Sequence, residues 1–198
     1  MAHGFVIGVT RRCLNETDDA LADVRDAVEL GRRVANPRPV MYALTIQGEV
    51  LIEGLRLDDA EPSLNEALTN SETLGNRRFR GYVLMELAHL SVMSDDLDKA
   101  RSRLDEARDI SVEIDPRFIG ARIAGVMAFA ARDPAARAAA LAEGQDILGR
   151  GCIAHNHFCF YRDAIDASII GKDWAEALRY AAAMEDFTAE EPLPWAEF

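Results

Sequence analysis

The chain repeats itself every forty residues, and this period constrains its fold more than any other feature. Similar segments start at Asp18 (DDALADVRDAVELGRR), Asp58 (DDAEPSLNEALTNSET) and Asp98 (DKARSRLDEARDISVE). Each holds an alanine, a large aliphatic residue and a second alanine at the same offsets: Ala20, Val24 and Ala27; Ala60, Leu64 and Ala67; Ala100, Leu104 and Ala107. Residues spaced by four and three lie on one stripe of a helix. Each unit is therefore expected to contain a helix with a small-large-small face.

A second helix is expected ahead of each of these. Twelve positions before the first alanine, each unit has a small residue within a segment of helical length: Gly8, Gly48 and Ala88. Two helices approach closely only where the side chains at their crossing are small. We therefore expect helical hairpins that close at three pairs: Gly8 with Ala20, Gly48 with Ala60, and Ala88 with Ala100. The N-caps of the second helices are expected at Asp18, Asp58 and either Asp95 or Asp96.

Turn-forming residues recur with the same period and should separate the hairpins. They are Asn36-Pro37, Gly75-Asn76 and Asp115-Pro116. Beyond Pro116 we expect helices over 117–132, 135–148, 155–170 and 174–188. This predicts one domain of about ten helices, with approximate repeats at 1–36, 37–76, 77–116, 117–151 and 152–191 and a further helix starting within 192–198. Only FVIGV at 5–9, rich in β-branched residues, favours a strand instead.

These features resemble the tetratricopeptide-repeat (TPR) family. The shared pattern is a small residue in the first helix, alanine, a large apolar residue and alanine in the second, and turn residues between them. The resemblance implies an all-α array of helical hairpins stacked in a right-handed superhelix, with a concave surface that binds other proteins. The period of forty residues is longer than that family's usual spacing of about thirty-four.

A narrower resemblance concerns residues 133–198. The runs that carry it are ARDPAARAAALAEGQDILGRGCIAHNHFCFYRDAID, GKDWAEALRYAAAME and EEPLPW. They are similar to the C-terminal repeat region of bacterial proteins in which a class III adenylate or guanylate cyclase domain precedes an ATPase domain. The resemblance implies a place in signal transduction. It does not imply catalysis here, because the only Gly-Lys pair, Gly171-Lys172, precedes Asp173 and so lacks the Ser or Thr of a phosphate-binding loop.

The charge balance narrows the classes of partner. Asp and Glu total 34 against 22 Lys and Arg, which gives a formal net charge of −12. Nucleic acid and anionic membranes are poor partners for such a chain.

No apolar run is long enough to span a bilayer, and the first residues do not form a signal peptide. With only three cysteines, a cytoplasmic location is expected.

The segment 150–165 (RGCIAHNHFCFYRDAI) raises the question of a metal site. On a helix, Cys152, His155 and Cys159 would lie within a sector of about 60°, whereas His157 would point away. A site of three ligands would need His89 or a carboxylate to complete it. Zinc sites usually separate two ligand pairs by a long loop. We therefore favour cysteines that act as small core residues, and we expect no cofactor.

The concave side of the first helices is the expected binding surface. Its predicted residues are Phe5, Arg12, Tyr42, Thr45, Glu49, Tyr82, Met85, Glu86, His89, Arg122, Phe129 and Arg162. Tyr, Phe, Met and Arg are enriched in interface cores, so a protein or peptide partner is expected. The alternative is that Tyr42 and Tyr82 pack between neighbouring hairpins with their hydroxyls at the surface. The negative net charge favours a basic or apolar partner, and the uncapped ends of the array favour a homo-oligomer.

The chain is thus expected to be a noncatalytic interaction or regulatory module. Arg162 and Asp166 have the spacing of a helical ion pair, and Asp163 adjoins them, but no nucleophile is evident nearby. The alternative hypothesis is a small-molecule or metal sensor that uses the region from Cys152 to Cys159. An enzyme is the third and least favoured hypothesis.

Overall fold

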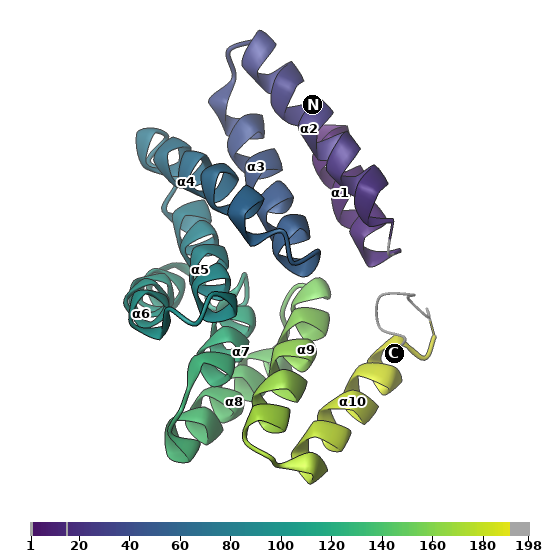
Figure 1. Ribbon diagram of the computed structural model, residues 1–198, viewed down its shortest axis with the longest axis vertical. Helices are drawn as coiled ribbons and strands as arrows, with labels where there is room; N and C mark the ends of the chain where they lie inside the picture. Colours follow the sequence, from purple (N-terminus) through teal and green to yellow (C-terminus); the bar gives the residue numbers. More distant parts are fainter. Residues whose placement is uncertain (1, 15, 191–198) are drawn as a thin grey trace.

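The structure, a computed structural model, describes residues 2–14 and 16–190, and these residues form ten helices and no strand (Figure 1). The helices are α1 (Ala2–Cys13), α2 (Thr17–Arg33), α3 (Pro37–Glu53), α4 (Leu57–Thr73), α5 (Arg77–Met93), α6 (Leu97–Ile114), α7 (Gly120–Ala130), α8 (Pro134–Gly149), α9 (His155–Ile170) and α10 (Trp174–Thr188). The predicted all-α class is confirmed. The segment 5–9 belongs to α1, so the alternative of a strand there is wrong. Residues 192–198 lie outside the described part of the chain.

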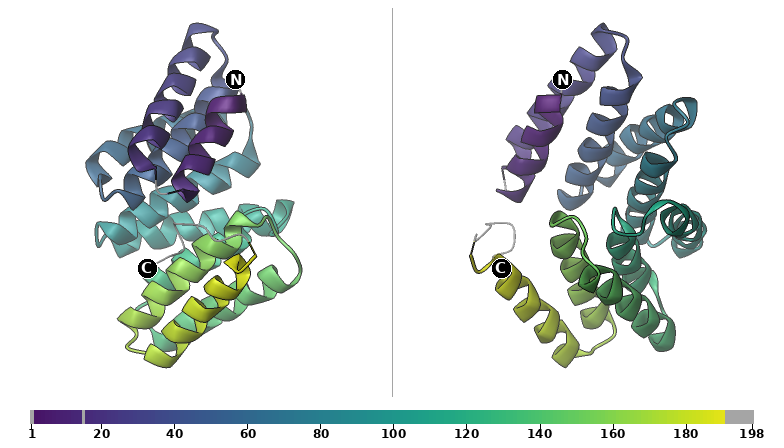
Figure 2. Two further views of the ribbon diagram at one scale, coloured as in Figure 1. Left: turned by 90° about the vertical axis from the view of Figure 1, so that its right-hand side faces the viewer. Right: turned by 180° about the vertical axis from the view of Figure 1, so that it is seen from behind.

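The helices pair into five successive hairpins that follow a curved path (Figures 1 and 2). In each hairpin the odd-numbered helix packs against the even-numbered helix that follows it. The odd-numbered helices also contact one another in succession, from α1 to α9. This arrangement places the first helix of every hairpin along one continuous seam. No helix in the described ranges combines the length and the apolar character needed to cross a membrane.

Five of the turns between helices have the same geometry. The middle residue is left-handed in each case: Ala35 (φ 50°), Leu55 (φ 56°), Gly75 (φ 60°), Asp95 (φ 57°) and Lys172 (φ 58°). The next amide donates back into the preceding helix, for example from Asn36 N to Gly31 O at 3.0 Å and from Arg56 N to Leu51 O at 2.8 Å. This is the Schellman arrangement that ends many helices. One repeated turn therefore fixes the direction of each following helix.

Side-chain caps start five of the helices. Asn36, Asn76, Asp96, Asp133 and Asp173 each accept a hydrogen bond from a backbone N–H in the first turn of α3, α5, α6, α8 and α10, respectively. The prediction for Asp96 is confirmed. The predictions for Asp18 and Asp58 are wrong, because α2 and α4 begin one residue earlier and carry these carboxylates inside the first turn. There they still oppose the positive end of the helix dipole.

Close packing within the hairpins depends on glycine. A Cβ added at Gly8 would lie 2.5 Å from Val24 Cγ1, and one added at Gly48 would lie 2.4 Å from Leu64 Cδ2. The nearest neighbour of each glycine is therefore the large residue of the predicted stripe. Of Ala20, only the carbonyl oxygen is among the atoms nearest to a Cβ added at Gly8. No atom of Ala60 is among those nearest to a Cβ added at Gly48. The glycines of the first two hairpins therefore pack against Val24 and Leu64 rather than against the predicted Ala20 and Ala60.

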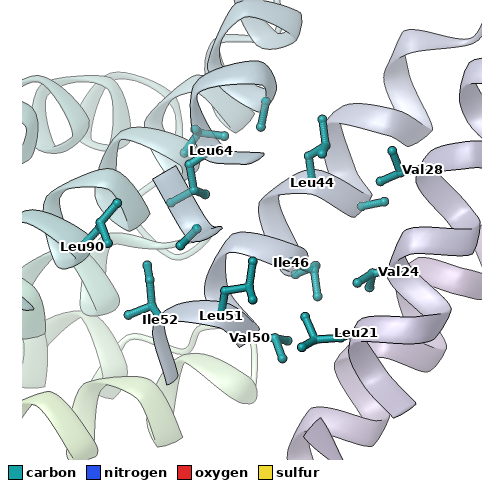
Figure 3. Close-up of a cluster of buried hydrophobic side chains, with 14 of the residues drawn as sticks. Leu21, Val24, Val28, Leu44, Ile46, Val50, Leu51, Ile52, Leu64 and Leu90 are labelled. Carbon is teal, nitrogen blue, oxygen red and sulfur yellow. The ribbon is translucent and has the colours of Figure 1, made fainter. Parts of the chain in front are cut away.

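The largest apolar core spans the first three hairpins. Figure 3 shows Leu21 and Val24 of α2 pointing toward Val50 and Ile46 of α3. The same core continues through Leu64 of α4 into α5. Burial of these aliphatic side chains is the main stabilisation of the N-terminal half.

The C-terminal hairpins pack differently from the first three. Helix α9 lies mainly against α7, whereas its contact with α8 is slight. Gly125 of α7 allows this approach, because an added Cβ would lie 3.1 Å from Asp163 Cβ. Gly144 of α8 leaves room for the Phe160 ring of α9, since an added Cβ would lie 2.1 Å from Phe160 Cε2. The predicted helix over 117–132 is too long, because residues 116–119 form a turn and α7 starts at Gly120. Helix α9 also contacts the second hairpin, since Arg162 in the middle of α9 pairs with Glu53 at the end of α3 at 2.7 Å (Figure 1).

Candidate functional site

A buried network of charged side chains joins the first helices of all five hairpins. Glu49 of α3 lies at its centre. Its Oε1 accepts hydrogen bonds from Arg12 of α1 at 2.8 Å and from Arg122 of α7 at 2.6 Å. Its Oε2 accepts a hydrogen bond from the hydroxyl of Tyr82 of α5 at 2.9 Å. That hydroxyl in turn accepts from Arg122 at 2.7 Å.

The network extends along the seam in both directions. Arg122 also donates to Glu86 of α5 at 2.6 Å. Arg12 and Arg162 converge on the same oxygen of Glu53, at 2.8 and 2.7 Å. Arg162, which projects from α9, also donates to Asp163 at 2.9 Å. We call these eight residues the inner network: Arg12, Glu49, Glu53, Tyr82, Glu86, Arg122, Arg162 and Asp163.

The charges of the inner network balance when one carboxyl is protonated. Three guanidinium groups face four carboxyl groups. Burial, together with the negative charge of Glu49, raises the pKa of Glu86 to about 8. Burial also disfavours the charged form of Glu49, but Arg12 and Arg122 outweigh it and lower the pKa of Glu49 to about 2. Near neutral pH, Glu86 therefore keeps its proton, which removes one negative charge from the inner network.

Most of the predicted groove residues belong to this buried seam. Only 3% of Glu49, 0% of Glu86 and 2% of Arg122 is exposed. Arg12 and Tyr82 are also buried. The sequence predicted that these side chains would face a partner from an open concave strip. In the structure they face one another, because α9 packs on α7 and closes the seam.

The remaining predicted groove residues have different surroundings. Met85 lies in the apolar core, and the buried hydroxyl of Thr45 donates to Met41 O at 2.8 Å. His89 is buried edge-on to Phe129, with ring centroids 6.2 Å apart. Burial lowers the pKa of His89 to about 4. The side chain of Phe5 lies outside the described residues.

Half-buried aromatic side chains lie beside the network at the starts of the first helices. The rings of Tyr42 in α3 and Phe79 in α5 are 4.2 Å apart, and Phe79 is 5.9 Å from Phe118 in the turn before α7. The guanidinium carbon of Arg78 lies 4.9 Å from the centre of the Phe118 ring. We call Tyr42, Phe79 and Phe118 the aromatic strip. Tyr42 thus packs against the next hairpin, as the alternative prediction expected, but the hydroxyl of Tyr82 is buried in the inner network and does not lie at the surface. Sequence reasoning missed Phe79 and Phe118 as site residues, although Phe79 lies three residues after the predicted break at Gly75-Asn76 and Phe118 lies within the predicted helix over 117–132.

A pocket of about 360 Å³ opens next to the aromatic strip, between α1 and the start of α9. We call it the α1–α9 pocket. Apolar side chains form most of its wall: Val9, Ile46, Phe79, Phe118 and Ile153. Its polar lining residues are Thr10, Arg12, Glu49, Tyr82 and His155.

The candidate metal ligands do not come together. Cys159 is fully buried, and burial raises the pKa of its thiol. Cys152 Sγ lies 3.6 Å from Ile153 O, whereas His155 lines the α1–α9 pocket. His157 stacks on Phe187 with ring centroids 4.2 Å apart. Over the described ranges, no three His, Cys, Asp or Glu side chains are grouped so that they could hold a metal ion.

Arg162 of α9 does not form the expected ion pair with Asp166 but pairs with two other carboxylates. Arg162 pairs with the neighbouring Asp163 and with Glu53 of α3, both within 3 Å. Burial and the charge of Asp163 raise the pKa of Asp166. The pairing of Arg162 therefore links two distant hairpins.

No model of a known protein family matches this chain, and no curated protein matches it.

Proposed function

We propose that the chain is a noncatalytic binding module of the tetratricopeptide type, which captures a mainly apolar protein segment along the aromatic strip. The observation that carries this proposal is the alignment of Tyr42, Phe79 and Phe118 across three successive hairpins. Half-buried aromatic residues supply a large contact area at a low cost in conformational entropy. Aromatic and arginine side chains are also those that contribute most to binding at interfaces.

The inner network supports this function by holding the strip in place. Tyr82 packs against both Phe79 and Phe118, at 5.7 and 6.2 Å between ring centroids. Its hydroxyl is bonded to Glu49 and Arg122, so its ring has little freedom to move. A surface that is ordered before binding loses less conformational entropy when a partner arrives.

The local charge refines the expected partner. The negative net charge favours a basic or apolar segment, but exposed Arg38 and Arg78 stand one helical turn before Tyr42 and Tyr82. A strongly basic segment would be repelled by these arginines. The strip therefore suits an apolar or aromatic segment with few positive charges.

Selection of displayed random peptides against the immobilised protein tests this proposal. We expect enrichment of apolar sequences whose binding is lost in the variant Tyr42→Ala with Arg78→Glu. Arg132→Glu is the matched control, because it makes the same charge change at an exposed ion pair far from the strip. No enrichment, or peptides that bind the strip variant as well as the wild type, would overturn the proposal.

Three further proposals concern signalling, location and self-association. The similarity of residues 133–198 to cyclase–ATPase proteins supports a role in bacterial signalling, and three free cysteines support a cytoplasmic location. Co-purification with a tagged cyclase–ATPase protein from a bacterial host would test the first.

Exposed Trp174 and Leu178 on α10 support a second copy of this chain as another partner. Leu178→Glu should then lower the mass measured by light scattering.

A further inference from the structure

The α1–α9 pocket is assembled from distant parts of the chain. Val9 comes from α1, Ile46 from α3 and Phe79 from α5. Phe118 comes from the turn before α7, and Ile153 from the segment before α9. The pocket therefore forms only when these five segments of the chain are folded together. Its volume of about 360 Å³ lies near the lower end of the range for small-molecule sites, which is roughly 300–1,000 Å³.

The floor of the pocket is polar, but its charges are already paired. Both oxygens of Glu49 accept hydrogen bonds from Arg12, Arg122 and Tyr82. A charged ligand would bring an unpaired ion into a largely apolar space, which is costly. An uncharged ligand would leave the balance of the inner network unchanged. The chemistry of the floor therefore selects against both anions and cations.

The wall favours aromatic ligands. Phe79 and Phe118, whose ring centroids are 5.9 Å apart, both line the pocket, with Val9, Ile46 and Ile153 as further apolar lining residues. Offset or edge-to-face contacts with these rings would add to the burial of apolar area. His155 supplies one hydrogen-bonding group, and burial, assisted by the positive charge of Arg122, lowers its pKa to about 4. The imidazole is therefore neutral near pH 7 and can accept a hydrogen bond.

We propose that the α1–α9 pocket binds an uncharged aromatic small molecule of about two fused rings that carries one hydrogen-bonding group. This assigns a ligand to the chain in addition to its protein partner. Because Ile153 and His155 line the pocket, this ligand would contact the segment between α8 and α9.

Three naphthalenes of similar size test the chemistry. Calorimetric titration at pH 7 should show that 2-naphthol binds the full chain. The anion 2-naphthoate and the cation 2-naphthylmethylamine should each bind at least roughly tenfold more weakly. Equal affinity for the three compounds would overturn the selectivity, and no binding of any of them would overturn the site.

Two variants locate the binding. Ile153→Trp should fill the pocket and abolish the binding of 2-naphthol; this residue is 43% exposed in a segment outside the helices, so the fold should survive. Val112→Trp on α6 is the control, because Val112 is 63% exposed and does not line the pocket. Unchanged binding by Ile153→Trp would overturn the proposal. The result is independent of the peptide proposal, because Tyr42 and Arg78 do not line the pocket and their double variant should still bind 2-naphthol.

Discussion

Arg122 donates a hydrogen bond of 2.6 Å to Glu49, although 73 residues separate them in the chain. The pair joins α7 to α3, and the same guanidinium also bonds Tyr82 and Glu86 of α5. One side chain thus connects the first helices of three hairpins. In a simple repeat array each hairpin contacts only its neighbours, so this link adds a long-range constraint to the curvature.

Arg122→Met tests the energetic role of this link. The substitution keeps an unbranched side chain but leaves Glu49 and Glu86 without their shared cation, so we expect the free energy of unfolding to fall by about 3–5 kcal/mol. Chemical denaturation followed by circular dichroism measures this loss. Arg132→Met removes an exposed ion pair with Asp95 and should cost no more than about 0.5 kcal/mol. Equal losses in both variants would contradict a structural role for the network.

Glu86 makes stability depend on pH in an unusual direction. Because burial and Glu49 raise the pKa of Glu86 to about 8, the folded protein holds a proton that the unfolded chain releases near pH 4.5. Between these values the unfolded state binds fewer protons, so the free energy of unfolding should fall as pH rises. The slope from this group is at most roughly 1.4 kcal/mol per pH unit.

Glu86→Gln should flatten this dependence. Urea denaturation at pH 5, 6, 7 and 8 would compare the variant with the wild type. His89 and His155 act in the opposite sense below about pH 6.5, but both proteins contain them, so their effect cancels in the comparison. Glu113→Gln, at an exposed pair with Arg77, is the control and should keep the wild-type slope. An unchanged slope in Glu86→Gln would mean that Glu86 is ionised in the folded protein.

The period of forty residues predicted much of the fold. Helices α2, α4 and α6 start at Thr17, Leu57 and Leu97, which preserves the period, and the predicted bounds of α9 and α10 are confirmed. Local patterns were sufficient because caps, turns and stripes act over a few residues. The start of α7 was missed because Asp115, followed by proline, bonds the amide of Arg117 and forms a turn instead.

The candidate site was only partly predictable. The repeat register placed Glu49, Tyr82, Glu86 and Arg122 on one side of the first helices, and the structure brings them together there. Their burial depends on how α9 packs against α7, which no local pattern reports. The available signal was that the predicted strip holds residues of both charges, Arg12 and Arg122 with Glu49 and Glu86, on the same side of the first helices. Opposite charges on one side of neighbouring helices favour side chains that pair with one another in the folded protein. They disfavour a surface whose charges stay unpaired until a charged partner binds.

Gly144→Ala tests the packing of the Phe160 ring against α8. The added Cβ would lie 2.1 Å from Phe160 Cε2, and the ring is fully buried, so we expect a loss of about 1–3 kcal/mol in the free energy of unfolding. Gly149→Ala changes the last residue of the same helix, where nothing lies within 4 Å, and should be neutral or slightly stabilising. Phe160→Leu should relieve part of the clash, so the double variant should be more stable than the sum of the single losses predicts.

The repeated left-handed turn gives the last prediction. Gly75 has φ 60° and nothing within 4 Å of an added Cβ, so Gly75→Ala should cost about 1 kcal/mol through the backbone alone. Leu55 has φ 56° in an equivalent turn, so its side chain already destabilises the folded protein in this backbone conformation. Leu55→Gly should therefore raise the melting temperature, since the exposed side chain contributes little burial in return. Opposite shifts in the two variants, measured by thermal denaturation, would support the same turn geometry at both positions, whereas a fall in both would show that Leu55 is held there by contacts stronger than the backbone strain.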